Sequence, residues 1–146
     1  MKWPYIVLAL VAGFIVPLQA GINVRLRTAL GDTSLAAMVS FLVGFVGLAA
    51  WCLARGWGWP VGALSRGPWW MWTGGLLGAF FVAGTILAAA KLGAAGMLGW
   101  VVASQLVAGL LLDHYGAAGF VIREVSWMRV LGALLLILGA VLVERY

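Results

Sequence analysis

Hydrophobic positions along this chain fall into five long stretches separated by short polar or glycine-containing connections. The stretches are Trp3–Ile22, Ser34–Ala54, Trp69–Ala90, Ala95–Leu112 and Met128–Val143. An α-helix needs about 20 apolar residues to cross a hydrocarbon layer that is about 30 Å thick. The short alternation of barrel strands is missing, and irregular backbone cannot face lipid. The pattern therefore predicts an all-α integral membrane protein with five transmembrane helices in a single domain, 1–146.

Residues that favour helix ends lie between these stretches. Asp32–Ser34 can cap the second helix, and Ser126 can cap the fifth. Pro68 suits the start of the third helix, where its missing N–H has no cost. Lys91, Gly93 and Gly96 predict a tight hairpin between the third and fourth helices.

Two connections are longer than the others. They are Arg55–Gly67 and Asp113–Val125. The second contains three adjacent apolar residues, 120–122, so it is predicted to lie flat in the membrane interface. Most of the nine tryptophans lie near predicted helix ends or in the first of these connections, which is typical of the headgroup boundary.

Composition supports the membrane assignment and excludes other classes. Hydrophobic residues make up 65% of the chain and charged residues 9%, whereas a soluble domain carries about a quarter charged residues. The net charge of +5 comes from single basic residues at span ends, where they can reach phosphate headgroups. They form no basic stripe, so no nucleic-acid partner is expected. The single cysteine, Cys52, permits no internal disulfide.

The basic residues are divided almost equally between the two sides of the membrane. With five spans, one side carries Lys2, Arg55, Arg66, Arg123 and Arg129, and the other carries Arg25, Arg27, Lys91 and Arg145. A clear excess of Lys and Arg normally sets the orientation of a membrane protein. Here the excess is one charge, which predicts insertion in both orientations and pairing as an antiparallel homodimer of ten helices.

The first helix contains polar side chains at membrane depth. Gln19 and Asn23 are four residues apart and share a helix face, and Pro17 should bend or break the helix beside them. Such a break next to two amides is typical of solute sites in transporters. The alternative is a proline kink with amides that bond between helices, worth about 1 kcal/mol each.

The fourth helix places Ser104 and Gln105 near the middle of the membrane, one turn after Trp100. Polar side chains are costly there, so each is a candidate site residue. In an antiparallel pair, Gln19, Asn23 and Gln105 from both copies could line one cavity, with Trp100 as an aromatic wall. Two more hydroxyls, Ser40 and Thr85, complete the predicted substrate-binding set, although both can bond to their own helix backbone four residues back.

Charged candidates lie nearer the helix ends. Arg25 follows the polar end of the first helix, and Asp113 and His114 follow the fourth. Together with Pro17, they are candidates for gating or coupling, while phosphate contacts for Arg25 and a boundary cap for Asp113 are the simpler interpretations. No carboxylate lies inside a span, although proton-coupled cation exporters usually need one.

Small residues are spaced for close contact between helices. Gly74 and Gly78 form a GxxxG motif in the third helix, and Gly132 and Gly139 are one heptad apart in the fifth. We assign these glycines to helix packing. The fifth helix has no polar side chain from Leu131 to Val143, so it is predicted to be a scaffold or dimer helix.

Motifs occur in order along nearly the whole chain. They are Gln19-x-x-x-Asn23-x-x-Leu26, Ser40-Phe41-x-x-Gly44, Trp69-Trp70-x-x-x-Gly74-Gly75-x-x-Gly78, Lys91-Leu92-Gly93, Gln105 and Asp113-His114-x-Gly116-x-x-Gly119. In this spacing they resemble the small YdcZ-like family of the drug/metabolite transporter superfamily, five-span proteins of the bacterial inner membrane.

The resemblance implies a ten-helix fold built from two inverted five-helix halves, which a homodimer would supply here. In that fold the first four helices of each half surround the pocket and the last packs peripherally, in agreement with the apolar fifth helix. Related four-span multidrug exporters carry a glutamate in the first helix, which this chain lacks. Gln19 and Asn23 cannot perform its proton chemistry.

The sequence therefore predicts a secondary transporter that moves a small polar metabolite by alternating access at a two-fold site. A passive channel and a non-transporting subunit that stabilises a partner are the alternatives. No residues form a catalytic pair, and no Walker loop, HExxH motif or zinc spacing occurs, so neither an enzyme nor a cofactor or metal is expected. The predicted partners are a second copy, the lipid bilayer and a small-molecule substrate.

Overall fold

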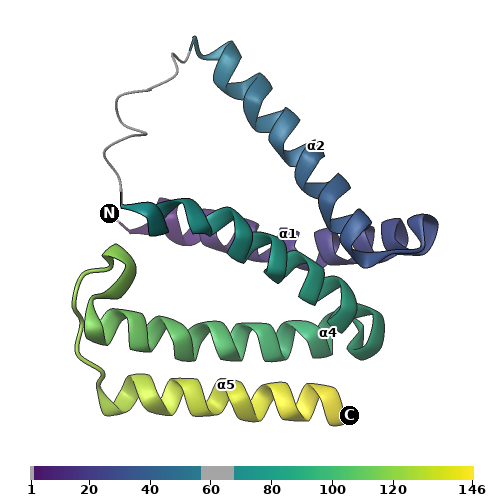
Figure 1. Ribbon diagram of the computed structural model, residues 1–146. Helices are drawn as coiled ribbons and strands as arrows, with labels where there is room; N and C mark the ends of the chain where they lie inside the picture. The colour runs from purple at the N-terminus through teal and green to yellow at the C-terminus, as the bar shows by residue number, and fades with distance from the viewer. Residues whose placement is uncertain (1, 57–67) are drawn as a thin grey trace. The chain divides into compact units, whose positions relative to one another are not determined.

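The computed structural model describes residues 2–56 and 68–146, and its regular elements in these ranges are all helices (Figure 1). This agrees with the predicted all-α class. Most of the predicted connection Arg55–Gly67, with Trp57, Trp59 and Arg66, lies outside the described residues. The chain forms two compact units, Met1–Leu87 and Ala88–Tyr146.

The first unit begins with helix α1, Trp3–Leu30, which is longer than the predicted span ending at Ile22. Its last turns carry Arg25 and Arg27, whose long side chains can leave the membrane while the backbone remains helical. The helix ends at Gly31, which has φ 75° and ψ −2° and whose N–H donates to the carbonyl of Arg27. Glycine adopts this left-handed conformation without steric cost, so it ends the helix.

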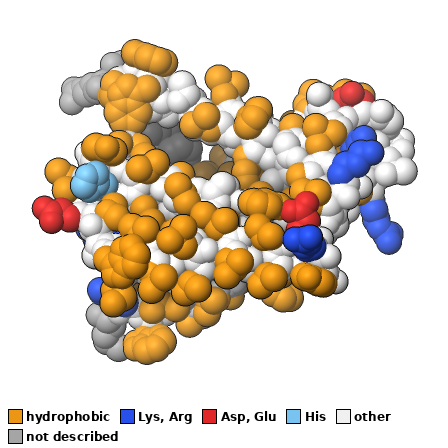
Figure 2. All heavy atoms as spheres, turned by 90° about the horizontal axis from the view of Figure 1, so that it is seen from below, with side chains coloured by type: hydrophobic (Ala, Val, Ile, Leu, Met, Phe, Trp, Pro, Cys, Tyr) orange, Lys and Arg blue, Asp and Glu red, His pale blue; other side chains and the backbone are white. Residues whose placement is uncertain are grey.

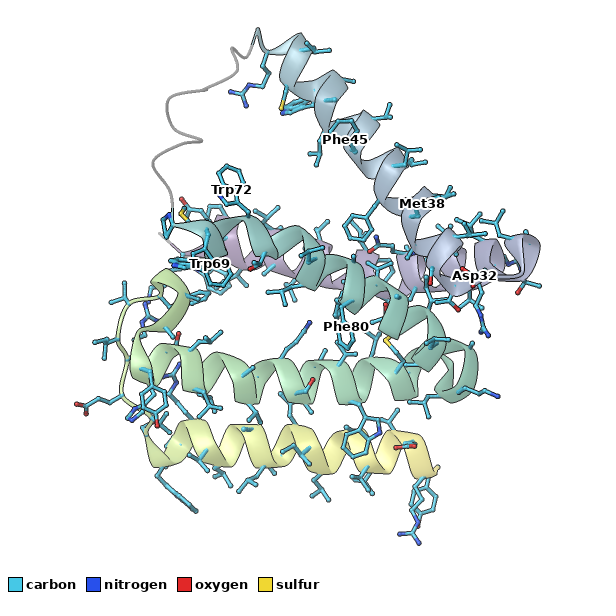
Figure 3. All side chains as sticks on the ribbon, in the orientation of Figure 1. Asp32, Met38, Phe45, Trp69, Trp72 and Phe80 are labelled. Carbon is cyan, nitrogen blue, oxygen red and sulfur yellow. The ribbon has the colours of Figure 1, made fainter. Side chains whose placement is uncertain are left out.

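Helix α2, Thr33–Ala54, starts at the predicted cap. The carboxylate of Asp32 accepts a hydrogen bond of 2.8 Å from the backbone N–H of Leu35. Figure 3 labels Asp32 at this end of α2, with Met38 and Phe45 further along the same helix. Met38 and Phe45 are seven residues apart and are both exposed, so the described residues leave this face of α2 uncovered.

The core of the first unit is built from small and branched side chains. Helices α1 and α2 are in direct contact. The buried cluster comprises Ala36, Ala37, Val82 and Ile86, with Val24, Leu26 and Ala83 packed against it. Alanines on α2 allow close approach of neighbouring helices, which is how helices associate when lipid provides no hydrophobic drive.

The predicted third and fourth spans form one continuous helical segment, Trp69–Tyr115. The short 3₁₀-helix η1, Trp69–Thr73, follows Pro68 and leads into α4, Gly74–Tyr115. Gly93 interrupts α4 with φ 73° and ψ 177°, which is not a helical conformation. The interruption lies within the hairpin predicted at Lys91–Gly96, where glycine can adopt a positive φ.

The second unit contains the later part of α4, the 3₁₀-helix η2, Ala117–Gly119, and α5, Trp127–Arg145. The later part of α4 and α5 lie side by side and antiparallel (Figure 1). Ser126 caps α5, as predicted, by accepting a 3.4 Å hydrogen bond from the N–H of Arg129. A Cβ atom on Gly99 would lie 3.2 Å from both Cα and Cβ of Ala140, so the two helices approach closely there.

Within the described residues, four helical segments are long and apolar enough to cross a membrane, the third being Trp69–Tyr115 with its interruption. Their most apolar windows are only 6–17% buried. Figure 2 shows a face where hydrophobic side chains predominate and few charges occur. Exposed apolar surface on this scale fits a lipid environment rather than water.

Candidate functional site

A hollow in the first unit brings together two predicted site residues. Its volume is about 370 Å³, and Gln19 of α1 lies in its wall together with Ser40 of α2. The rest of the wall consists of Phe41, Gly44, Phe45 and Leu48. An amide and a hydroxyl therefore enter a largely apolar surface, an arrangement suited to a small polar solute.

Two further predicted residues of the first unit are buried. Asn23 is 3% exposed and Thr85 is 8% exposed. The Thr85 hydroxyl donates a 3.0 Å hydrogen bond to the carbonyl of Val82, which is three residues back in its own helix rather than the four that the sequence suggested. Gln19, one turn before Asn23, is exposed, so the two amides have different surroundings despite their spacing.

A second hollow, also of about 370 Å³, lies in the second unit and is lined by Trp100 and Ser104. Its other lining residues are Ala103, Val107, Ala108, Leu111 and Ile137. The Ser104 hydroxyl donates to the carbonyl of Val101 at 2.9 Å. Gln105 is exposed but does not line this hollow, because adjacent helix residues differ in direction by about 100°.

The wall residue Trp100 has a partner that sequence reasoning missed. Its indole N–H donates a hydrogen bond to the carboxylate of Glu144 on α5. From the sequence, Glu144 is expected only to be a charged residue at the end of a span. Consecutive membrane spans are antiparallel, so the end of α5 lies near the start of the fourth span. This arrangement could have been used to predict the contact between Glu144 and Trp100.

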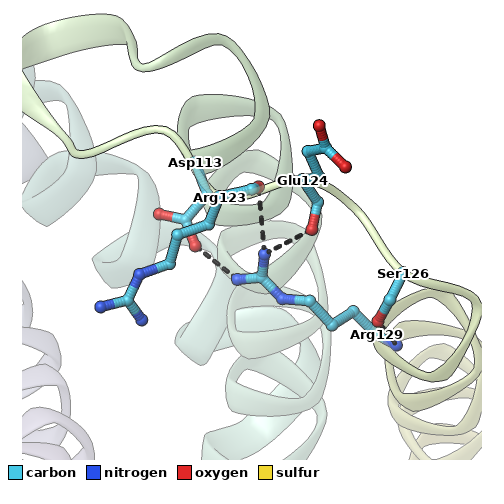
Figure 4. A network of polar contacts seen from close by, with 5 residues as sticks. All are labelled: Asp113, Arg123, Glu124, Ser126 and Arg129. Atoms are coloured by element: carbon cyan, nitrogen blue, oxygen red, sulfur yellow. Dashed lines mark hydrogen bonds and ion pairs between the residues drawn. The ribbon is translucent and has the colours of Figure 1, made fainter.

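Asp113 belongs to a polar network between α4 and α5 (Figure 4). Its carboxylate forms an ion pair with the guanidinium of Arg129, while its backbone carbonyl accepts a 2.8 Å hydrogen bond from the N–H of Arg123. The sequence places Asp113 beside His114 but does not predict the pair with Arg129. His114 is exposed, and its ring meets that of Tyr115 edge to face at 4.9 Å between centroids.

The remaining gating candidates lie on α1. Arg25 is exposed near the end of the helix. Pro17 lies inside α1, which continues through it, so of the predicted bend or break the break does not occur. A proline removes one hydrogen bond and crowds one carbonyl, which a helix can accommodate without ending.

The four packing glycines have different surroundings. A Cβ atom on Gly78 would lie 3.4 Å from the ring of Phe41, so Gly78 is in close contact with α2. Apart from their own helix backbone and chain neighbours, no atom of the described residues lies within 4 Å of the corresponding position at Gly74, Gly132 or Gly139. Gly132 and Gly139 line a groove on α5 with Ala95 and Gly99 of α4, which leaves them accessible to a further helix.

No cluster of three or more His, Cys, Asp or Glu residues that could hold a metal ion occurs in the described ranges. The polar side chains that line the two hollows are the amide of Gln19, the hydroxyls of Ser40 and Ser104 and the indole of Trp100, and all of these bind by hydrogen bonds. The arrangement can bind a small solute, and its long apolar helices define a helical membrane protein.

Comparison with known proteins identifies the family. The family described as "Putative inner membrane exporter, YdcZ" matches residues 4–142. The chain therefore belongs to the YdcZ family, which confirms the resemblance seen in the sequence. It is a multi-pass inner-membrane protein, and the description of its family is that of an inner-membrane exporter.

One curated relative is similar over part of the chain. Inner membrane protein YdcZ of Escherichia coli (strain K12) is 42% identical over 82 residues, which cover 56% of this chain and 54% of the relative. The match thus spans about half the length of that relative. No solved structure matches the chain.

Proposed function

We propose that this protein is a secondary transporter that carries a small polar metabolite across the inner membrane by alternating access. The substrate site would lie at the two-fold axis of an antiparallel homodimer, in which each copy contributes five membrane spans. The interruption at Gly93 supports counting α4 as two spans. The exporter description of the family supports outward movement of the substrate.

The exposure of Gln19 and Gln105 is the observation that carries this proposal. Both amides lie well inside long apolar helices, and both are exposed in the single chain. An amide that faces hydrocarbon without a partner costs several kcal/mol, roughly 2–7 depending on the reference state. A second copy that covers these amides would remove the cost and give the cavity a polar lining.

The lining also indicates the substrate class. Amides and hydroxyls bind neutral polar groups, and the carboxylates of Asp113 and Glu144 are already engaged by Arg129 and Trp100. Neither of these two carboxylates is therefore free to bind a lipophilic cation. A neutral or weakly anionic metabolite fits this chemistry better.

Cysteine labelling tests the antiparallel assembly without knowledge of the substrate. A cysteine added before Lys2, with Cys52→Ser as background, should be labelled from outside intact spheroplasts in about half of the molecules, because the Lys and Arg bias is one charge. Two lysines added beside Lys2 should shift the labelled fraction toward zero. Labelling of every amino terminus from the same side in the unmodified chain would contradict dual orientation.

Transport itself is tested in liposomes with a metabolite identified by thermal stabilisation of the purified protein. A carrier should saturate and show counterflow of labelled metabolite. Flux that does not saturate, with measurable current, would instead identify a channel.

A further inference from the structure

The connection between α4 and α5 presents three adjacent apolar side chains outward. Phe120, Val121 and Ile122 are 56%, 77% and 68% exposed. The helices on both sides, which end at Tyr115 and begin at Trp127, are long enough and apolar enough to cross the membrane. Covalent linkage therefore keeps the connection at the membrane boundary. Three apolar side chains exposed at this boundary need an environment other than bulk water.

The backbone of this connection has a defined conformation. The N–H of Phe120 donates to the carbonyl of Ala117 at 3.1 Å, and the N–H of Arg123 donates to that of Asp113 at 2.8 Å. Gly116 has φ 59°, and a Cβ atom there would lie only 2.6 Å from Cγ1 of Ile122. Ile122 therefore packs directly over the backbone of Gly116, and the backbone that carries the three apolar side chains is fixed by these hydrogen bonds.

Arg129 stabilises the same connection from the first turn of α5. Its guanidinium pairs with the carboxylate of Asp113, and it also donates to the carbonyls of Arg123 and Glu124 at 3.4 and 3.5 Å (Figure 4). One cation thus satisfies a carboxylate and two carbonyls of irregular backbone. This lowers the cost of placing the connection where water is scarce.

Arg123 supplies a charge suited to the membrane surface. Its guanidinium has no ion pair among the described residues, and in Figure 4 it points away from Arg129. The carboxylate of Glu124 points to a different side in the same view. An exposed guanidinium beside apolar side chains matches the phosphate that lies above the acyl chains of a phospholipid.

We propose that Phe120–Arg123 is a membrane-surface anchor whose partner is the phospholipid headgroup layer. Phe120, Val121 and Ile122 enter the boundary between headgroups and acyl chains, and Arg123 binds a lipid phosphate. The Asp113–Arg129 pair holds the anchor in position. This role does not depend on the proposed transport function.

Depth-dependent quenching tests the anchor in the intact protein. Val121→Cys and Glu124→Cys are each prepared with Cys52→Ser, labelled with an environment-sensitive fluorophore and placed in nanodiscs of phosphatidylcholine and phosphatidylglycerol. Acyl-chain-brominated lipid should quench the probe at position 121 at least about twofold more than the probe at 124, and iodide should show the reverse order.

Two results would overturn the proposal. Equal iodide quenching at both positions would place the connection in water. Protection of position 121 from both quenchers would indicate that protein, rather than lipid, covers it. Because Val121 is highly exposed in the chain, its replacement should not disturb folding.

The role of the ion pair is tested in the Val121→Cys background. Asp113→Asn should increase iodide quenching of the probe, and the conservative Asp113→Glu should restore protection. Helix content measured by circular dichroism serves as the folding control. Unchanged quenching in Asp113→Asn would show that the pair does not position the anchor.

Discussion

The indole N–H of Trp100 donates a hydrogen bond to the carboxylate of Glu144, 44 residues later in the chain. This bond links the later part of α4 to the last turn of α5 and fixes one wall of the hollow that contains Ser104. A hydrogen bond to a charged acceptor can stabilise a fold more than a neutral one, although exposure of both residues reduces its contribution.

Replacement of the donor should therefore lower stability. We expect Trp100→Phe to reduce the free energy of unfolding by about 1 kcal/mol, because the ring remains and the N–H is lost. Denaturation in mixed micelles, followed by circular dichroism, measures the change. Trp127→Phe is the matched control because Trp127 is 68% exposed at the start of α5. Equal stability of the two variants would mean that the bond contributes nothing.

The close contact between Gly99 and Ala140 predicts a steric effect. Gly99→Ala should destabilise the second unit by about 1–2 kcal/mol, since the new Cβ meets the backbone of Ala140, which cannot move independently of α5. Gly109→Ala on the same helix enters open space and should cause no loss of stability. The same denaturation measurement compares them, and a stable Gly99→Ala protein would show that the helices separate easily.

The cap of α2 provides a local prediction. Asp32→Ala removes the acceptor for the Leu35 N–H and should cost about 1 kcal/mol of stability, whereas Asp32→Asn keeps an acceptor and should cost less. Thermal denaturation followed by circular dichroism distinguishes the two variants. If both lose the same stability, the charge of Asp32 rather than its cap bond is the important feature.

The proposed site predicts loss of transport without loss of assembly. We expect Gln105→Ala, and separately Asn23→Ala, to reduce counterflow at least about tenfold while crosslinking still detects the dimer, because a lost hydrogen bond in a buried site costs about 1–3 kcal/mol. Val102→Ala, an exposed apolar position on the same helix as Gln105, is the control. Normal counterflow in both amide variants would show that the substrate binds elsewhere.

Much of the fold was predictable because it depends on local chemistry. The caps at Asp32 and Ser126 and the interruption at Gly93 agree with the sequence, since short-range hydrogen bonds and allowed φ values determine them. Of the bend or break predicted at Pro17, the break does not occur, because a proline only weakens a helix locally and the rest of α1 continues it. The predicted five spans and their antiparallel pairing remain predictions.

Less of the candidate site was predictable. The spacing of Gln19 and Asn23 indicates one helix face, yet one amide lies in a hollow with Ser40 while the other is buried. Ser104 lines the hollow of the second unit, whereas its neighbour Gln105 does not. Spacing gives relative directions within a helix, but the packing of adjacent helices determines which direction is covered.

The sequence by itself determined the membrane class, the main helical segments and the family of this protein. Hydrophobic length, bilayer thickness and local capping are properties of continuous segments, so they can be read along the chain. The tertiary structure alone decided that Asp113 pairs with Arg129, that Glu144 holds Trp100, and that α4 approaches α5 at Gly99. These contacts join residues 16 to 44 positions apart, and they depend on the rotation and relative position of two helices, which no local pattern specifies.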